Sequence, residues 1–424
     1  MKPFKMLGLS DSLVETLEKL KIVEPTEIQE KTIPLALAGR DVIGESATGS
    51  GKTLAFGACI VERLQGKKGV QALVLTPTRE LAEQNGKSLK MFARHTSLRV
   101  ATVYGGVGLG PQTEELQRAD VVVGTPGRIL DHLERRTLNL RNVSILVLDE
   151  ADRMLDMGFI EDVTTIINAC PKNRQTLLFS ATISSDIAYL AKRYMRDSVG
   201  VSSKAYVDTS KLAQAYYDVP KDQKFSLLVH LLKNEHGGLV MVFCNTRRTA
   251  DYVGNNLSRQ GIKAMTIHGG LTQAKRNSIM KHFHDSHVYV LVCTDVAARG
   301  LDIKGVSHVY NYEIPVNSKD YIHRIGRTAR AGEEGKAISL VSERDYDNFR
   351  AVLRDPSLHI ASIPIPAIER VFVHFSERRD SRQHHVYRMR GTRNTNQAYG
   401  NRRTHSRMPY RQNRSRYNNT RNFK

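Results

Sequence analysis

The chain has 424 residues, an apolar fraction of 40% and a formal net charge of +20. This length allows two domains of ordinary size, and the apolar content excludes a wholly disordered protein. The four cysteines lie far apart without a CxxC pair, which argues against a zinc site or a disulfide framework and fits a reducing cytosol. The amino-terminal residues lack the apolar core of a signal peptide, and no run is long enough to cross a membrane. We therefore expect a cytoplasmic protein without membrane contact.

Apolar runs of strand length alternate with segments of helical spacing along most of the chain. The runs that we interpret as strands are 41–45, 72–75, 121–123, 145–148, 177–179, 239–243, 288–292 and 306–310, and the clearest helical segments are 80–92, 188–195 and 249–260. Strands that alternate with helices predict parallel sheets covered by helices on both faces. So many strands exceed one compact unit, and the polar segment 202–211 offers a linker. We therefore predict two α/β domains in tandem.

A glycine-rich turn follows the first predicted strand, where residues 46–53 read SATGSGKT. Gly49 and Gly51 permit a tight turn whose backbone N–H groups face a phosphate at a helix N-terminus. Lys52 would then reach the β- and γ-phosphates of a nucleotide, and Thr53 would ligate Mg²⁺. The usual first glycine of this P-loop pattern is Ser46 here, and taken alone the pattern also fits an ordinary glycine-rich loop.

An acidic cluster ends the predicted strand 145–148, where residues 144–152 read SILVLDEAD. A carboxylate at the tip of a buried strand beside a P-loop is the Mg²⁺-side acid of an NTPase, which assigns that role to Asp149. Glu150 would orient and deprotonate the attacking water, and Asp152 would have a structural or coupling role. The alternative is three solvated acids that cap the next helix. A P-loop about 100 residues upstream in the same α/β domain favours the NTPase.

Together with the P-loop, the letters DEAD resemble the signature of the DEAD-box RNA helicases, which have two tandem RecA-like domains. The chain matches that family's motifs in the expected order over about residues 4–365. The matches in the first half are Lys21 to Gln29 (the adenine-reading Q motif), Phe4 (an aromatic that stacks on the base), Pro77 to Leu81, Gly105-Gly106, Thr125 to Arg128 and Ser180-Ala181-Thr182. Those in the second half are Val242 to Thr246, Gln273 to Arg276, Thr294 to Asp302 and Tyr321 to Arg330. Departures are Ser46-Ala47, Lys21 and Ala329, and none removes a group that performs chemistry.

The resemblance implies a site for each step of an ATP-dependent cycle. The nucleotide would be bound by Phe4, Gln29, Thr48, Gly49, Ser50, Gly51, Lys52, Thr53 and Asp302, and Mg²⁺ by Thr53 and Asp149. The catalytic residues would be Lys52, Asp149, Glu150, Arg327 and Arg330, and the coupling residues Asp152, Ser180, Thr182, His323 and Arg324. Arg327 and Arg330 would act as arginine fingers, which contribute on the order of 10³ or more in rate, so hydrolysis would require the two domains to close. The alternative for residues 323–330 is an RNA-facing or solvated basic helix.

RNA is the second ligand that the resemblance implies. Its contacts would be Arg79, Gly106, Thr125, Arg128, Thr246, Arg247, Gly269 and Thr294. Hydroxyls, glycines and arginines suit the sugar–phosphate backbone, so we expect little sequence preference. Residues 376–424 carry fourteen basic and two acidic side chains, which places +12 of the net charge in this segment. With its interspersed tyrosines it predicts a disordered tether for RNA, and the alternative is a tail that only aids solubility.

The predicted organisation is therefore a first RecA-like domain at 1–203, a linker at 204–211, a second RecA-like domain at 212–365 and a disordered basic tail at 366–424. The predicted function is an ATP-dependent RNA helicase that unwinds or remodels duplexes locally and without processive translocation. The alternatives are an ATP-gated RNA clamp or annealing chaperone, a DNA-directed helicase, which the Q motif and the letters DEAD disfavour, and an inactive scaffold, which the presence of Lys52, Glu150 and both arginines disfavours. The sequence identifies no protein partner and no particular RNA.

Overall fold

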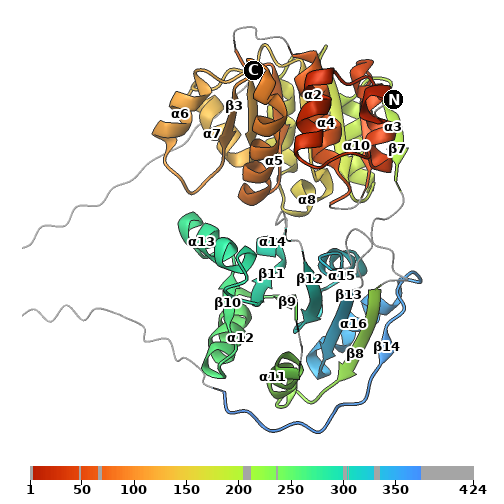
Figure 1. The fold of residues 1–424 in the computed structure, drawn as a ribbon, viewed down its shortest axis with the longest axis vertical. Coiled ribbons are helices and arrows are strands. Elements are labelled where there is room, and N and C mark those ends of the chain that lie inside the picture. Colours follow the sequence, from red (N-terminus) through yellow and green to blue (C-terminus); the bar gives the residue numbers. More distant parts are fainter. Residues whose placement is uncertain are drawn as a thin grey trace, which may run out of the picture. The chain divides into compact units, whose positions relative to one another are not determined.

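Two parallel seven-stranded sheets organise the residues that the computed structural model describes, which are 3–46, 49–64, 69–203, 212–234, 237–298, 303, 305–328 and 335–373. We call the parts built on these sheets the first lobe (residues up to 203) and the second lobe (residues 212–373). The fold class predicted for both is confirmed (Figure 1). Among the described residues no helix combines the length and the apolar character that crossing a membrane requires.

The sheet of the first lobe has the strand order β3-β4-β2-β5-β6-β1-β7, and all its pairings are parallel. Its strands are β1 (Val42–Glu45), β2 (Ala72–Leu75), β3 (Val100–Val103), β4 (Val121–Gly124), β5 (Ile145–Leu148), β6 (Gln175–Ser180) and β7 (Val199–Ser202). The central strands β2, β4 and β5 are buried at every position. Burial on both faces explains why their sequences are continuous apolar runs rather than alternating ones.

Helices cover both faces of this sheet. One face packs against α1 (Pro3–Met6), α2 (Asp11–Lys19), α3 (Glu27–Leu37), α4 (Lys52–Arg63), α5 (Arg79–Phe92) and the short 3₁₀ helix Ala93–His95. The other face packs against α6 (Leu109–Leu116), α7 (Pro126–Glu134), α8 (Ala151–Asp156), α9 (Ile160–Ala169) and α10 (Ser185–Tyr194). Side chains of successive residues in a strand pack into the cores on opposite faces of the sheet, as those of Val147 and Leu148 in β5 do.

The sheet of the second lobe has the order β10-β11-β9-β12-β13-β8-β14 and is also parallel. Its strands are β8 (Leu212–Asp218), β9 (Leu239–Cys244), β10 (Ala264–Ile267), β11 (Val290–Thr294), β12 (Val306–Asn311), β13 (Gly335–Val341) and β14 (Ala361–Ser362). Its helices are α11 (Lys224–Asn234), α12 (Arg247–Arg259), α13 (Gln273–His284), α14 (Asp295–Ala298), α15 (Ser318–Ile325), α16 (Tyr346–Leu353) and the 3₁₀ helix Glu343–Asp345.

The predicted motifs follow strands in both lobes. In the first lobe the P-loop follows β1, Pro77 to Leu81 follows β2, Thr125 follows β4 and Asp149 follows β5. The strand ends are level with one another, since Leu75 pairs with both Gly124 and Leu148. Parallel strands end at a common edge of their sheet, and ligands of open α/β sheets bind at that carboxyl edge. The topology therefore gathers motifs that lie far apart in the sequence.

Residues 366–373, which the sequence analysis placed in the tail, lie against the second lobe. Ile368, Val371 and Val373 pack on the core that contains α11, and the backbone N–H of Val371 donates to Ser226 Oγ at 3.0 Å. The predicted domain boundaries stay predictions. The linker at 204–211 and the tail from residue 374 onward lie outside the described residues.

Candidate active site

Two side chains of the segment 26–29 donate hydrogen bonds to backbone carbonyls of the predicted phosphate loop. Gln29 Nε2 donates to Gly51 O at 3.0 Å, and Thr26 Oγ1 donates to Ser50 O at 2.7 Å. Gly51 has a φ of 96°, and a Cβ there would lie 2.3 Å from Gln29 Nε2, so both backbone conformation and space require glycine. The Q-motif glutamine thus contacts the P-loop itself. Thr48, a predicted nucleotide ligand, lies outside the described residues.

Lys52 is the first residue of α4 and is buried. Its Nζ donates to Ser46 O at 2.9 Å, and Ser50 Oγ donates to Ser46 Oγ at 3.0 Å. Ser46, which replaces the usual glycine, therefore accepts a hydrogen bond at its backbone and another at its side chain. Both bonds close the loop on itself, at the position where backbone N–H groups would surround a phosphate.

Asp149 follows β5 and is buried. Asn85 of α5 donates from Nδ2 to Asp149 Oδ2 at 2.7 Å, and Thr53 Oγ1 donates to Asn85 Oδ1 at 3.0 Å. Burial raises the pKa of Asp149 to about 6; Lys52 opposes this shift and Glu150 adds to it. Asn85 was not identified from the sequence, since an asparagine inside a helical segment carries no motif. Its contacts with two predicted Mg²⁺ ligands could be found only from the fold.

One oxygen of Asp149 has no hydrogen-bond partner among the described residues. Oδ1 is buried and accepts no hydrogen bond from any described residue, although buried carboxylate oxygens are normally paired. Hard oxygen donors of this kind suit Mg²⁺, which is typically bound by one or two protein groups together with phosphate oxygens and water. The residues present therefore fit the predicted cation.

Glu150 adopts a left-handed backbone conformation, with φ 51° and ψ 51°, at the residue that precedes α8. For a residue with a side chain this conformation costs about 1 kcal/mol or more and persists only where the surrounding structure imposes it. The side chain is buried. Backbone strain is thus located at the residue predicted to act as the base.

The predicted coupling residues of the first lobe contact one another. Thr182 Oγ1 donates to Asp152 Oδ2 at 3.2 Å, and Ser180 Oγ donates to Thr182 O at 2.7 Å. From α15, Lys319 Nζ lies 3.8 Å from Asp152 Oδ2. A neighbouring ion pair joins Arg153 to Asp320 of α15 at 3.0 Å. Asp152 therefore contacts both the Ser-Ala-Thr motif and the helix that precedes the predicted arginine fingers.

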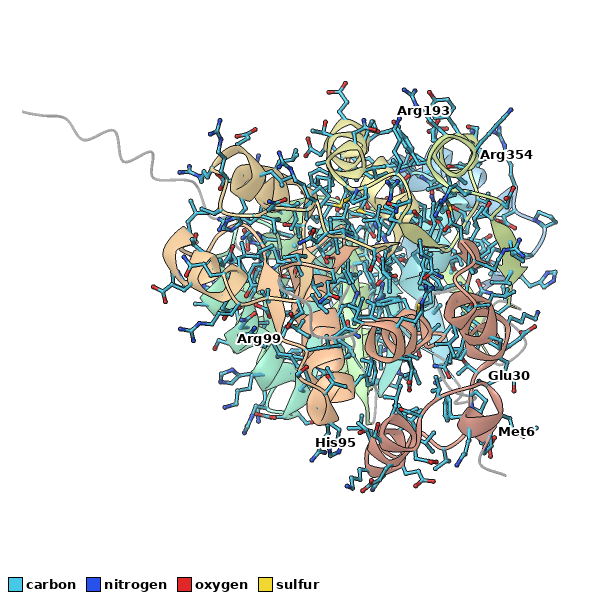
Figure 2. All side chains as sticks on the ribbon, turned by 90° about the horizontal axis from the view of Figure 1, so that it is seen from above. Met6, Glu30, His95, Arg99, Arg193 and Arg354 are labelled. Atoms are coloured by element: carbon cyan, nitrogen blue, oxygen red, sulfur yellow. The ribbon has the colours of Figure 1, made fainter. Side chains whose placement is uncertain are left out.

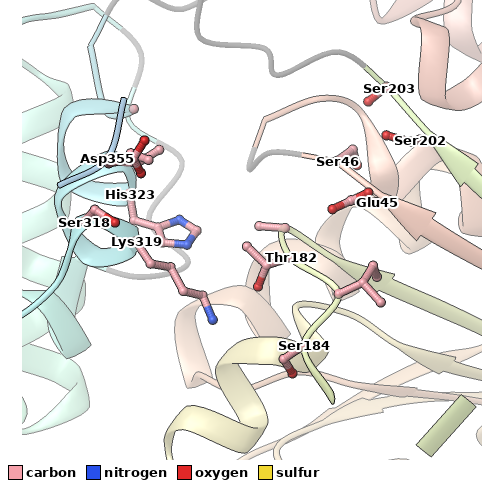
Figure 3. A pocket seen from close by; sticks show the side chains of 14 residues that line it. Glu45, Ser46, Thr182, Ser184, Ser202, Ser203, Ser318, Lys319, His323 and Asp355 are labelled. Carbon is pink, nitrogen blue, oxygen red and sulfur yellow. The ribbon is translucent and has the colours of Figure 1, made fainter. Parts of the chain in front are cut away.

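A pocket of about 590 Å³ lies beside these residues (Figure 3). Thr182 and Ser46 line it from the first lobe, and Lys319 and His323 of α15 line it from the second. His323 is thus placed next to the coupling motif. Asp302 and Arg330 lie outside the described residues, and Arg327 is buried.

Arg324, which the sequence analysis assigned to coupling, is anchored inside the second lobe. It is only 1% exposed and pairs with both oxygens of Asp295, through Nε at 2.6 Å and NH2 at 2.7 Å. It also donates to Glu313 O and Asn245 Oδ1, and its guanidinium lies over the Phe243 ring. These contacts join Arg324 to Asn245 and Asp295, which belong to two other predicted motifs of the second lobe, and the coupling role of Arg324 stays a prediction.

Five of the predicted RNA ligands line a single cavity of about 460 Å³, namely Arg79, Thr125, Arg128, Arg247 and Gly269. Gly106 adjoins it, since a Cβ at Gly106 would lie 2.1 Å from Arg79 NH1. Thr246 caps α12, where its Oγ1 accepts from Thr249 N. Thr294 ends β11 and does not line the cavity.

Phe4, the residue predicted to stack on the base, lies on the short helix α1. Its ring is 2% exposed and belongs to the core of the first lobe. Met6, two residues further along α1, is 71% exposed and lies at the outside of the molecule (Figure 2), so α1 turns Phe4 inward. The role of Phe4 in stacking on adenine stays a prediction.

Known proteins share these features. The family model for the DEAD/DEAH box helicases matches residues 26–190, and that for the conserved C-terminal helicase domain matches residues 223–332. The DEAD-box ATP-dependent RNA helicase CshA of Bacillus cereus is 44% identical over 372 residues, which cover 87% of this chain and 71% of that protein. The ATP-dependent RNA helicase CshA of Listeria monocytogenes is 44% identical over 375 residues, with coverage of 88% and 72%.

A solved structure gives the same result. Dbp5 of S. cerevisiae bound to RNA and ADP BeF3 has a TM-score of 0.79 at 31% identity, and the match covers 86% of this chain and 96% of that one. The motifs, the two parallel sheets and these relatives agree, and the chain belongs to the DEAD-box family of ATP-dependent RNA helicases.

Proposed function

We propose that the chain couples ATP hydrolysis at the P-loop to local, non-processive remodelling of RNA. The observation that carries this proposal is the hydrogen-bonded series Thr53–Asn85–Asp149, which joins the phosphate loop to the acidic motif. Thr53 and Asp149 would hold Mg²⁺, which supplies charge neutralisation for the phosphate oxygens. Asp149 Oδ1, which is buried and accepts no hydrogen bond from a described residue, supports this assignment.

In this mechanism Lys52 releases Ser46 O and donates to the β- and γ-phosphates instead. Glu150 accepts a proton from the water that attacks the γ-phosphorus, and its constrained backbone holds it in place. Arg327 and Arg330 of the second lobe stabilise the charge that develops on the transferred phosphoryl group. The contacts of Asp152 with Thr182 and with Lys319 connect this chemistry to the second lobe.

RNA would bind along the cavity lined by Arg79, Thr125 and Arg247. These side chains and the adjoining glycines suit the sugar–phosphate backbone, so recognition is largely independent of base sequence. Because ATP and RNA both favour closure of the lobes, each raises the affinity for the other by the same factor. The arginine-rich tail would add a non-specific tether. A cytoplasmic location belongs to this proposal and is supported by four cysteines that are all free.

The test is the steady-state ATPase rate of the full chain with structured RNA, with DNA and without nucleic acid. We expect RNA to raise the rate many-fold, DNA to leave it unchanged, and Glu150→Gln to abolish it. A rate near zero with every RNA would contradict the proposal.

An ATP-gated RNA clamp or annealing chaperone is the remaining alternative. Duplex-unwinding and strand-annealing assays separate it from a helicase, since a clamp would bind RNA in the presence of ATP and leave duplexes intact. Removal of residues 374–424 should weaken annealing more than unwinding, because annealing relies on non-specific RNA contacts.

A further inference from the structure

The loop Gly105-Gly106 connects β3 to the segment before α6 and adjoins the cavity proposed for RNA. Both ends of this loop are held by side chains through backbone carbonyls. Gln112 Nε2 donates to Tyr104 O at 3.1 Å, immediately before the glycines. Arg128 donates from NH1 and from NH2 to Val107 O at 3.1 Å, immediately after them. The loop therefore depends on these two side chains for its position.

Gln112 and Arg128 are joined to each other and to a buried histidine. Arg128 NH1 donates to Gln112 Oε1 at 3.0 Å, and His132 Nε2 lies 3.2 Å from the same oxygen. His132 is completely buried on α7, four residues after Arg128. On α6 only Gln112 and Leu116 are buried, so Gln112 supplies much of the attachment of this helix.

The contacts determine which nitrogen of His132 carries a proton. Because Tyr104 O can only accept, it must face Nε2 of Gln112, and because Arg128 can only donate, it must face Oε1. The side-chain amide of Gln112 therefore has one orientation. Since Gln112 Oε1 can only accept, His132 Nε2 must donate to it. In the neutral ring Nδ1 is then an acceptor, and the hydroxyl proton of Thr137, which lies 2.8 Å from Nδ1 and 3.1 Å from His132 O, is shared between these two acceptors. Burial, reinforced by Arg128, lowers the pKa of His132, which favours this neutral form.

We propose that Gln112 and His132 are positioning residues for RNA binding, which act by fixing Arg128 and the Gly105-Gly106 loop. This inference rests on the proposed RNA cavity, and it assigns a role to two residues that touch no RNA themselves. Arg128, whose side chain is 12% exposed, contributes chiefly through the loop that it holds. Arg79, which lies against Gly105 and Gly106, is the residue placed to contact RNA directly.

The experiment uses the full chain and two matched pairs of variants. Gln112→Leu removes the network, and Gln117→Leu makes the same change at an exposed glutamine just after α6. His132→Met removes the Nε2 donor at similar length, and His132→Gln retains an amide donor near that position. The readouts are the RNA concentration that gives half-maximal ATPase stimulation, the kcat at saturating RNA, and the affinity for a fluorescent ADP.

We expect Gln112→Leu and His132→Met to raise the half-maximal RNA concentration about tenfold, which equals about 1.4 kcal/mol. The kcat and the ADP affinity should stay within about twofold of the values for the unmodified chain, because saturating RNA still holds the loosened loop in its bound position. Gln117→Leu and His132→Gln should behave as the unmodified chain does.

An unchanged half-maximal RNA concentration in both Gln112→Leu and His132→Met would overturn the positioning role. If His132→Gln is as impaired as His132→Met, ring volume rather than the donated hydrogen bond matters, and the positioning role is wrong. If Gln112→Leu also binds ADP less tightly, the substitution impairs folding. The comparison of His132→Met with His132→Gln then tests the positioning role. If Arg79→Ala leaves RNA stimulation of the ATPase unchanged, RNA does not bind in the proposed cavity.

Discussion

Asn85 donates a hydrogen bond to the buried carboxylate of Asp149 at 2.7 Å, and by this contact α5 supports the acidic motif at the end of β5. The same amide accepts the hydroxyl proton of Thr53, so the lone pairs of that hydroxyl remain available for a cation. Groups that orient metal ligands from behind commonly change metal affinity 10- to 100-fold when they are removed.

Asn85→Ala should therefore raise the Mg²⁺ concentration needed for half-maximal RNA-stimulated ATPase about tenfold or more. The reason is that Asp149 Oδ2 and Thr53 Oγ1 both lose their orienting partner. A Mg²⁺ titration at saturating ATP and RNA measures this, with Lys87→Ala on the exposed side of α5 as control. An unchanged Mg²⁺ requirement would show that Asn85 only fills space.

Asp149→Asn should abolish ATPase and yet stabilise the metal-free, nucleotide-free protein at pH 8. Burial raises the pKa of Asp149 to about 6, above its value in an unfolded chain, so the folded state binds the proton more tightly. Stability from this group is present below about pH 4 and is lost as the pH rises through about 6. The cost at pH 8 is at most about 3 kcal/mol, and an asparagine avoids it.

Thermal melts in a chelator at pH 8 and at pH 5 test this prediction. The advantage of Asp149→Asn should shrink at pH 5, where the unmodified carboxyl is largely protonated in the folded state. Asp156→Asn, at a part-exposed position of α8, is the control. An equal advantage at both pH values would mean that ionisation of Asp149 is not its source.

Lys21→Gly should stabilise the first lobe by about 0.5–1 kcal/mol. Lys21 has a φ of 60° just after α2, a conformation that favours glycine, and its side chain is exposed. Because the turn is already formed, we expect the KM for ATP to stay within about twofold. Glu15→Gly, at an exposed position in the interior of α2, is the opposite control, since there glycine should destabilise by about 1 kcal/mol. Urea unfolding of both variants measures these two opposite changes in the free energy of unfolding.

Arg324→Lys should destabilise the second lobe strongly, by about 3 kcal/mol or more, because a lysine cannot satisfy Asp295, Asn245 and Glu313 O together. Activity should then fall in parallel with the folded fraction, as followed by urea unfolding. His323→Ala should instead leave the unfolding midpoint nearly unchanged and lower the RNA-stimulated rate, because His323 lines the pocket beside Thr182. A folded, inactive Arg324→Lys protein would support the coupling role predicted for Arg324.

Most strands that the sequence revealed are buried on both faces, and β1, where alternate residues are only partly buried, is the exception. The expected ranges 72–75 and 145–148 coincide with β2 and β5, whose apolar runs are continuous. The strands β3, β7, β8, β10, β13 and β14 were not identified, and β3, β7, β10 and β14 lie at the edges of their sheets. The strands β3 and β10 are only partly buried, so a short sequence such as VATV in β3 carries too little hydrophobic signal.

Residue patterns alone identified the family and predicted the residues that would contact phosphate, since phosphoryl transfer needs a cation, a carboxylate and a glycine turn of recognisable spacing. The contacts of Asn85, Gln112 and His132, and the buried ion pair of Arg324 with Asp295, could be found only from the fold. These side chains act by hydrogen bonds to elements distant in the chain. A hydrogen bond depends on where its partner lies within a few tenths of an ångström, and no local pattern of residue types records that position.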